Sequence, residues 1–141
     1  MRGLCVSMLV CFSLVTGCGE SLPTTVPVRG RVTWQGKPLP MGTVTFQPTE
    51  SGAGAPLRPA VATIGSDGTY QLSTFRTHDG ASPGEYVVTI HASTPPPMEA
   101  GAPPPKWLVP PKYATAATSG LTATVPADAS EELVLDFDLK D

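Results

Sequence analysis

The chain has 141 residues and a formal net charge of −3, and its 9 basic residues are dispersed along the sequence. This distribution excludes the concentrated positive surface of a nucleic-acid-binding protein, while 17 prolines and 14 glycines exclude long helices and favour frequent turns. All 3 cysteines lie within the first 18 residues, so the rest of the chain can form no disulfide and no cysteine-ligated metal site.

The first 18 residues have the layout of a bacterial export signal. Arg2 provides a positive charge, residues 4–15 are almost wholly apolar, and the small Thr16 and Gly17 precede Cys18. The apolar run is shorter than the roughly 18 to 20 residues that a membrane-spanning helix needs. The arrangement resembles the lipobox of bacterial lipoproteins, which implies that residues 1–17 are cleaved and that Cys18 is lipidated. The alternative is an ordinary secretory signal in which Cys18 is incidental.

We therefore expect a cell-envelope protein that is attached to a membrane through lipid at Cys18 and faces the periplasm or the exterior. Two or more acyl chains anchor a protein stably, whereas a single chain does so reversibly. Residues 18–25 are interpreted as the lipidated cysteine and a polar tether. Gly19 stands where some lipoproteins retained at the inner membrane carry aspartate, and this favours the outer membrane.

Residues 26–141 have the two-residue periodicity of β-strands. In residues 26–34, Val26, Val28, Val32 and Trp34 alternate with polar side chains, which predicts a half-buried strand with Trp34 in the core. The same alternation predicts strands over residues 43–47, 60–64, 70–72, 85–92, 121–125 and 133–140, with turns between most of them. The sequence therefore predicts an all-β domain, an antiparallel β-sandwich of about seven strands with a transthyretin-like or immunoglobulin-like arrangement.

Residues 94–113 differ in kind, because they hold eight prolines together with Trp107, Leu108 and Tyr113. Proline fixes φ and lacks an N–H donor, so this segment is expected to be polyproline II or an irregular extended loop. Exposed aromatic residues are common anchors of protein interfaces, which makes Trp107 and Tyr113 candidate partner-binding residues. The alternative is that Trp107 and Leu108 fold back over an open end of the sandwich.

Five segments occur in an order that resembles a known domain family: Val28-Arg29-Gly30-Arg31-Val32, Gly36-Lys37-Pro38-Leu39, Gly42-Thr43-Val44, Asp67-Gly68-Thr69-Tyr70 and Pro83-Gly84-Glu85-Tyr86-Val87-Val88. Together they resemble the carboxypeptidase regulatory-like domain, a transthyretin-like (prealbumin-like) β-sandwich, over about residues 26–92. The C-terminal part resembles small planctomycete envelope lipoproteins that carry this domain. The resemblance implies a folding, spacing or binding module with no catalytic residues and no cofactor.

Two other classes of function are weighed against this interpretation. Some transthyretin-like sandwiches bind carbohydrate, and Trp107 and Phe75 would then be the stacking platforms. Intradiol dioxygenases hold iron with tyrosine and histidine, but the periodicity places Tyr70 and Tyr86 inward, His91 outward and His78 in a loop. Tyr113 is the third tyrosine of the chain. The tyrosines and histidines together do not form a cluster with the spacing of metal ligands.

Carboxylates next to glycine have an equally simple interpretation. Asp67 and Asp79 each precede a glycine, and Asp-Gly turns explain them without calcium.

Taken together, these observations predict a non-catalytic envelope lipoprotein, a structural or protein-binding β-sandwich module. Its expected partners are the membrane, through Cys18, and an envelope protein or a glycan, through residues 94–113. A carbohydrate-binding module is the first alternative, and an iron-dependent dioxygenase-like enzyme is the second.

Overall fold

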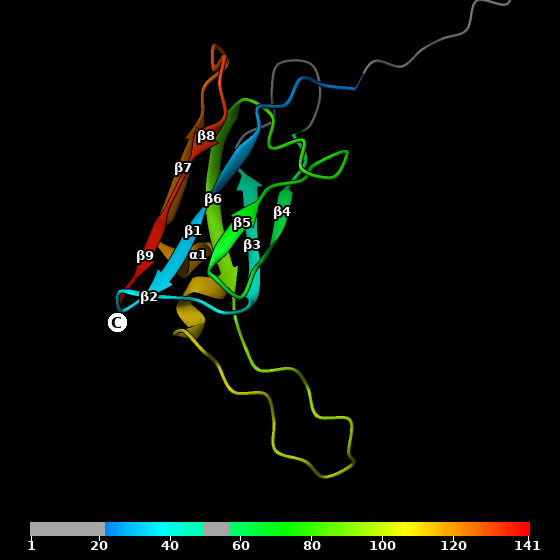
Figure 1. The fold of residues 1–141 in the computed structure, drawn as a ribbon, viewed down its shortest axis with the longest axis vertical. Helices are drawn as coiled ribbons and strands as arrows, with labels where there is room; N and C mark the ends of the chain where they lie inside the picture. Colours follow the sequence, from blue (N-terminus) through cyan, green and yellow to red (C-terminus); the bar gives the residue numbers. More distant parts are fainter. Residues whose placement is uncertain (1–21, 50–56) are drawn as a thin grey trace, which may run out of the picture.

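The computed structural model describes residues 22–49 and 57–141, which form two β-sheets packed face to face (Figure 1). The predicted signal at residues 1–17, Cys18, the first part of the tether and the loop over residues 50–56 lie outside the described residues. Among the residues described, there is no helix with the length and apolar character needed to cross a bilayer. The all-β sandwich predicted from the periodicity is confirmed.

The first sheet is built around β1 (Val28–Trp34). On one side, β1 pairs antiparallel with β2 (Lys37–Pro38) and β5 (Thr69–Gln71). On the other side, it pairs with β8 (Leu133–Val134) and β9 (Phe137–Leu139), and both of these pairings are parallel. The sandwich is therefore antiparallel except at the C-terminal strands, whose parallel pairing with β1 the alternation does not predict.

The C-terminal strand is also split in two, although its alternation predicts one strand over residues 133–140. The Asp136 carboxylate takes the place of a main-chain acceptor and binds the Arg31 N–H at 2.8 Å. Beside it, the Leu135 carbonyl accepts a hydrogen bond from the Tyr70 hydroxyl at 2.6 Å. A Cβ atom at Gly30 would lie 1.7 Å from this same carbonyl oxygen, so only glycine allows the approach. At the interruption the Leu135 N–H still donates to the Arg29 carbonyl, and side chains take the other hydrogen-bonding places between the two strands.

The second sheet has the strand order β4-β3-β6-β7, and all of its pairings are antiparallel. It consists of β4 (Ala60–Ile64), β3 (Gly42–Pro48), β6 (Gly84–His91) and β7 (Leu121–Val125). These four strands agree with the predicted segments to within about two residues. A bridge between Val61 and Ser73 links this sheet to the chain that follows β5.

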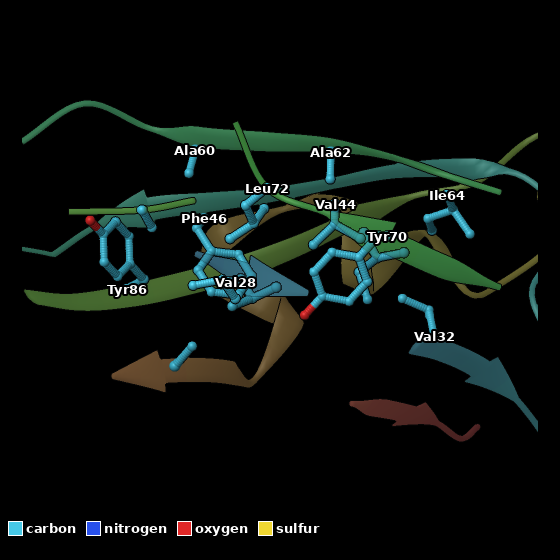
Figure 2. Packing of buried hydrophobic residues seen from close by; sticks show 14 of the residues in the cluster. Val28, Val32, Val44, Phe46, Ala60, Ala62, Ile64, Tyr70, Leu72 and Tyr86 are labelled. Atoms are coloured by element: carbon cyan, nitrogen blue, oxygen red, sulfur yellow. The ribbon is translucent and has the colours of Figure 1, made fainter. Parts of the chain in front are cut away.

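The core lies between the two sheets, where alternate residues of each strand meet. Phe46 is at its centre, with its ring centroid 5.7 Å from that of Tyr86 and 6.1 Å from that of Phe137 (Figure 2). Tyr70 and Tyr86 point inward as predicted, and His91 is exposed. Trp34, which the pattern places in the core, is only partly buried. It is the last residue of β1, and the turn at Gln35 and Gly36 reverses the chain directly after it.

The two ends of the sandwich carry different segments (Figure 1). At the tether end, defined here by residues 22–26 and 73–82, the chain enters β1 after Val26 pairs with Ala81. At the loop end, defined by residues 34–40 and 92–110, lie the β1–β2 turn and the proline-rich segment. The chain then forms a 3₁₀ helix, η1 (Pro111–Ala114), and a single turn of α-helix, α1 (Ala116–Ser119), against β6.

Candidate functional site

The proline-rich segment forms a hairpin whose stem is closed by hydrogen bonds. The Thr94 N–H donates to the Lys106 carbonyl at 2.8 Å, and the Leu108 N–H donates to the Ala92 carbonyl at 3.0 Å. The Lys106 N–H in turn donates to Thr94 Oγ1 at 2.9 Å. These bonds fix the base of residues 95–105, which we call the proline-rich hairpin.

The proline-rich hairpin itself is extended, irregular and almost wholly exposed, as predicted for this part of the segment. Its two arms carry three prolines each, and the missing N–H groups prevent the arms from pairing as strands. At its tip, the Ala102 N–H donates to the Glu99 carbonyl at 3.3 Å, and the Met98 side chain is fully exposed. The hairpin projects from the loop end, away from both sheets (Figure 1).

Trp107 lies at the base of the proline-rich hairpin, where it forms a bridge with Ser93. It is 46% exposed, and its ring stands edge to face against the His91 ring at a centroid distance of 4.8 Å. The next two residues turn inward, with Leu108 partly buried and Val109 buried in the core. The two alternatives raised by the sequence thus apply to different residues, because Leu108 and Val109 cover the sandwich end while Trp107 stays accessible.

Tyr113, the second candidate partner-binding residue, is buried and serves the fold. It is 7% exposed, and its hydroxyl donates to the Lys140 carbonyl at 2.6 Å and accepts from the Lys140 N–H at 3.1 Å. This double contact fastens η1 to the end of β9. Pro111 begins η1 because the fixed φ of proline suits a first helical turn. The expectation of an exposed aromatic residue here is corrected, since the predicted loop ends before this helix.

A surface groove beside the hairpin stem was not predicted. It has a volume of about 350 Å³ and is lined by Trp34, Gln35, Lys37, Pro38, Leu39, Pro40 and Leu108. We call it the Trp34 groove. The Gln35 side-chain amide donates to Asp141 Oδ2 at 2.9 Å, so a carboxylate lies close to the rim. The signal that reveals the groove is the Gln-Gly turn directly after Trp34, which marks this residue as the end of a strand.

The tyrosines weighed as iron ligands are engaged with the main chain. The Tyr70 hydroxyl donates to the Leu135 carbonyl, and the Tyr86 hydroxyl donates to the Ser82 carbonyl at 2.7 Å. Burial raises the pKa of both phenols and so disfavours the phenolate form. Among residues 22–49 and 57–141, no three histidine, cysteine or acidic side chains gather as a metal site.

The two Asp-Gly turns are capped by their own carboxylates. Asp79 accepts hydrogen bonds from the N–H groups of Thr74, Phe75 and Arg76 at 2.7, 3.0 and 2.9 Å. Partial burial alone would raise the pKa of Asp79, but these donors outweigh it, and the pKa lies below its ordinary value of 3.8. Asp67 accepts from the hydroxyl and the N–H of Thr69, which lowers its pKa in the same way. Both aspartates act as turn residues, in agreement with the prediction.

Comparison with known proteins finds structural similarity only at a low level. No family model matches the sequence, and no curated protein matches it. A solved structure that resembles this chain is the crystal structure of a DUF3823 family protein from Parabacteroides merdae, at 17% sequence identity and a TM-score of 0.41. The match covers 82% of this chain and 46% of that chain, so this chain spans less than half of that protein. Similarity at this level assigns neither a family nor a function, and the resemblance to the carboxypeptidase regulatory-like domain stays a prediction.

Proposed function

We propose that this chain is a non-catalytic, lipid-anchored module of the cell envelope that contacts a protein partner through its proline-rich hairpin. The observation that supports the proposal is the placement of two segments. Residues 22–25 leave the sandwich at the tether end, and the proline-rich hairpin projects from the opposite end (Figure 1). A domain lipidated through Cys18 would therefore hold the hairpin away from the membrane.

The length of the tether supports this orientation. The Val26 N–H donates to the Ala81 carbonyl at 2.8 Å, so the paired main chain begins eight residues after Cys18. Eight extended residues span at most about 28 Å. Leu22, Pro23, Thr24 and Thr25 line a surface pocket together with Phe75, Arg76 and Asp79, so half of the tether runs along the domain. The tether end would consequently lie close to the lipid headgroups.

The proline-rich hairpin has the physical properties of a preformed binding element. Its stem is closed by main-chain bonds, and its prolines restrict the arms, so binding would order few additional residues. It also exposes Met98 completely and leaves Trp107 half accessible at its base. Exposed tryptophan and methionine are enriched where proteins meet.

The proposal is tested by site-specific photo-crosslinking in intact cells. A crosslinker at position 98 should capture a discrete envelope partner, whereas a crosslinker at Val134, an exposed residue of β8, should not. Trp107→Ala should remove the product obtained from position 98. Cys18→Ser should move the chain from the membrane fraction to the soluble fraction. If Trp107→Ala lowers thermal stability but leaves the crosslinked product intact, the hairpin is not the contact element.

Carbohydrate recognition is the second candidate function, and the exposed indole of Trp107 favours it. Of the two stacking residues expected from the sequence, Phe75 lies beneath the Arg58 guanidinium, whose carbon is 5.6 Å from the ring centroid. Trp107 keeps an accessible ring that could stack on a sugar. A glycan array probed with the wild-type chain and with Trp107→Ala tests this function. Absence of binding, or equal binding by both chains, removes it.

A further inference from the structure

The Trp34 groove and the proline-rich hairpin lie at the same end of the molecule, and we propose that the groove receives the hairpin of a second copy of this chain. The proposal rests on the proposed function in one respect, which is that the hairpin is the contact element. It adds the identity of the receiving surface and of the partner. Two copies that exchange hairpins would form a closed dimer with two identical contacts.

The Trp34 groove has the chemistry of a receptor for extended proline-rich chains. Trp34, Pro38 and Leu108 give it an apolar lining, and Gln35 and Lys37 supply polar groups at its edge. Grooves lined by aromatic side chains bind polyproline II segments because the flat rings pack on the pyrrolidine rings. A proline-rich ligand also loses little conformational freedom on binding.

The proline-rich hairpin has the composition that such a groove accepts. Its arms contain Pro95, Pro96 and Pro97 on one side and Pro103, Pro104 and Pro105 on the other, and all six are exposed. The stem bonds between residues 94 and 106 and between residues 92 and 108 direct the hairpin away from its own domain (Figure 1). A hairpin held in this direction does not turn back into its own groove, so the occupant comes from another molecule.

The charges of the two surfaces are complementary in pairs. At the groove, Lys37 is exposed and the Asp141 carboxylate is held beside Gln35. On the hairpin side, Glu99 lies at the tip and Lys106 lies at the stem. In the described part of the chain, none of these four side chains belongs to an ion pair. An exchanged hairpin would place Glu99 toward Lys37 of the other copy and Lys106 toward Asp141.

A charge-swap experiment tests the exchange. The protein is the chain from residue 18 onward carrying Cys18→Ser, which retains every described residue and the entire core. Sedimentation equilibrium over a wide concentration range should detect a reversible dimer. Lys37→Glu and Glu99→Lys should each weaken association at least tenfold, and the double variant should restore it to within about threefold. Arg76→Glu reverses an exposed charge at the tether end and is the matched control, which should leave association unchanged.

A peptide of residues 95–106, which contains no tryptophan, probes the groove directly. When the groove is unaltered, the peptide should shift the Trp34 indole N–H resonance in the ¹⁵N spectrum. In the Lys37→Glu variant, the same peptide should cause a smaller shift. A monomer at all concentrations together with no shift overturns the proposal. Peptide binding by a chain that stays monomeric also overturns it, because the occupant is then a different proline-rich protein. A shift caused by chitooligosaccharide and not by the peptide overturns it in favour of a sugar.

Failure here and failure of the proposed function are separable. If the chain is a monomer but position 98 still crosslinks to another envelope protein, the hairpin keeps its role and the second copy is excluded. If the chain dimerises with the expected charge-swap pattern but a crosslinker at position 98 captures nothing in cells, the proposed function fails while the groove is supported. Crosslinking of position 98 to a second copy of the chain supports both.

Discussion

Replacing Asp79 with asparagine should destabilise the protein at neutral pH and have progressively less effect in acid. The Asp79 carboxylate accepts three main-chain hydrogen bonds, one at Oδ1 and two at Oδ2. Asparagine has a single acceptor oxygen, so its NH₂ group would face N–H donors that it cannot satisfy. The turn over residues 74–79 would therefore lose a charged acceptor and keep unpaired donors beside the tether.

The magnitude follows from the number of bonds and from their exposure. A hydrogen bond to a charged group contributes about 1.5 to 3 kcal/mol, and partial exposure of this turn places the total loss near the lower end, at about 2 kcal/mol. For a domain of this size, that loss corresponds to a decrease in Tm of about 8 °C. Asp128→Asn is the matched control, because Asp128 is exposed in the loop between β7 and β8, and it should change stability by less than about 0.5 kcal/mol.

The pH dependence gives the sharper test. The pKa of Asp79 is lowered in the folded protein from its ordinary value of 3.8, so the ionised carboxylate favours the folded state. Its contribution is complete above the unfolded-state pKa and is lost as the pH falls through the folded-state pKa. Urea unfolding of wild type and Asp79→Asn between pH 7 and pH 2.5 should therefore show a difference in free energy that shrinks below about pH 4. A difference that stays constant across this range would refute the inference that the ionised Asp79 carboxylate is stabilised by these hydrogen bonds.

Three further substitutions test the packing, each measured by urea unfolding at pH 7. Tyr113→Phe removes the hydroxyl that contacts the main chain after β9 and should cost about 1 to 2 kcal/mol; no loss would contradict its structural role. Gly80→Ala brings a Cβ atom to 1.7 Å from the Val26 carbonyl oxygen at a φ of +90°, so it should cost at least about 2 kcal/mol and expose the tether end to proteolysis. Leu139→Ala should cost about 2 to 5 kcal/mol because Leu139 is fully buried, whereas Val134→Ala should cost less than about 0.5 kcal/mol.

The inner faces of the strands could be predicted from the sequence because each sheet buries one face. In β4, for example, Ala60, Ala62 and Ile64 are buried, while Val61 and Thr63 are exposed, and this is the alternation that the residues display. Such a pattern depends only on which face meets the core. It is therefore local information that one strand carries by itself.

The pairing of strands could not be predicted in this way. Alternation in residues 133–140 gives the same buried face whether the strand runs parallel or antiparallel to β1. The direction of this strand relative to β1 depends on the path that the chain takes through η1, α1 and β7 before residue 133. The break at Asp136 also depends on a long-range contact with the Arg31 N–H, which no local pattern contains.

The candidate site was predicted in outline and missed in detail for a related reason. Proline content predicted an irregular extended segment, because the absence of N–H groups acts locally, but it did not predict the hydrogen-bonded stem that makes the segment a hairpin. It did not identify where the loop ends, since Tyr113 is drawn inward by its contact with Lys140, a residue far along the chain. The sequence pattern predicts Trp34 in the core because periodicity indicates which face of the sheet a side chain lies on. It does not indicate where the opposing sheet ends, and Trp34 is only partly buried.

The distribution of exposed apolar side chains favours binding over a purely structural role. In the described ranges, Met41, Met98 and Trp107 are exposed at or beside the loop end, whereas Leu22 is exposed at the tether end. The edge strands β4 and β8 expose Val61 and Val134, which solvent-facing edges commonly do and which form no common surface with the hairpin. Met98 and Trp107 flank the same hairpin, so the two exposed side chains could be covered by a single contact. Contact with another protein would bury both, which is what the proposed function requires of this end.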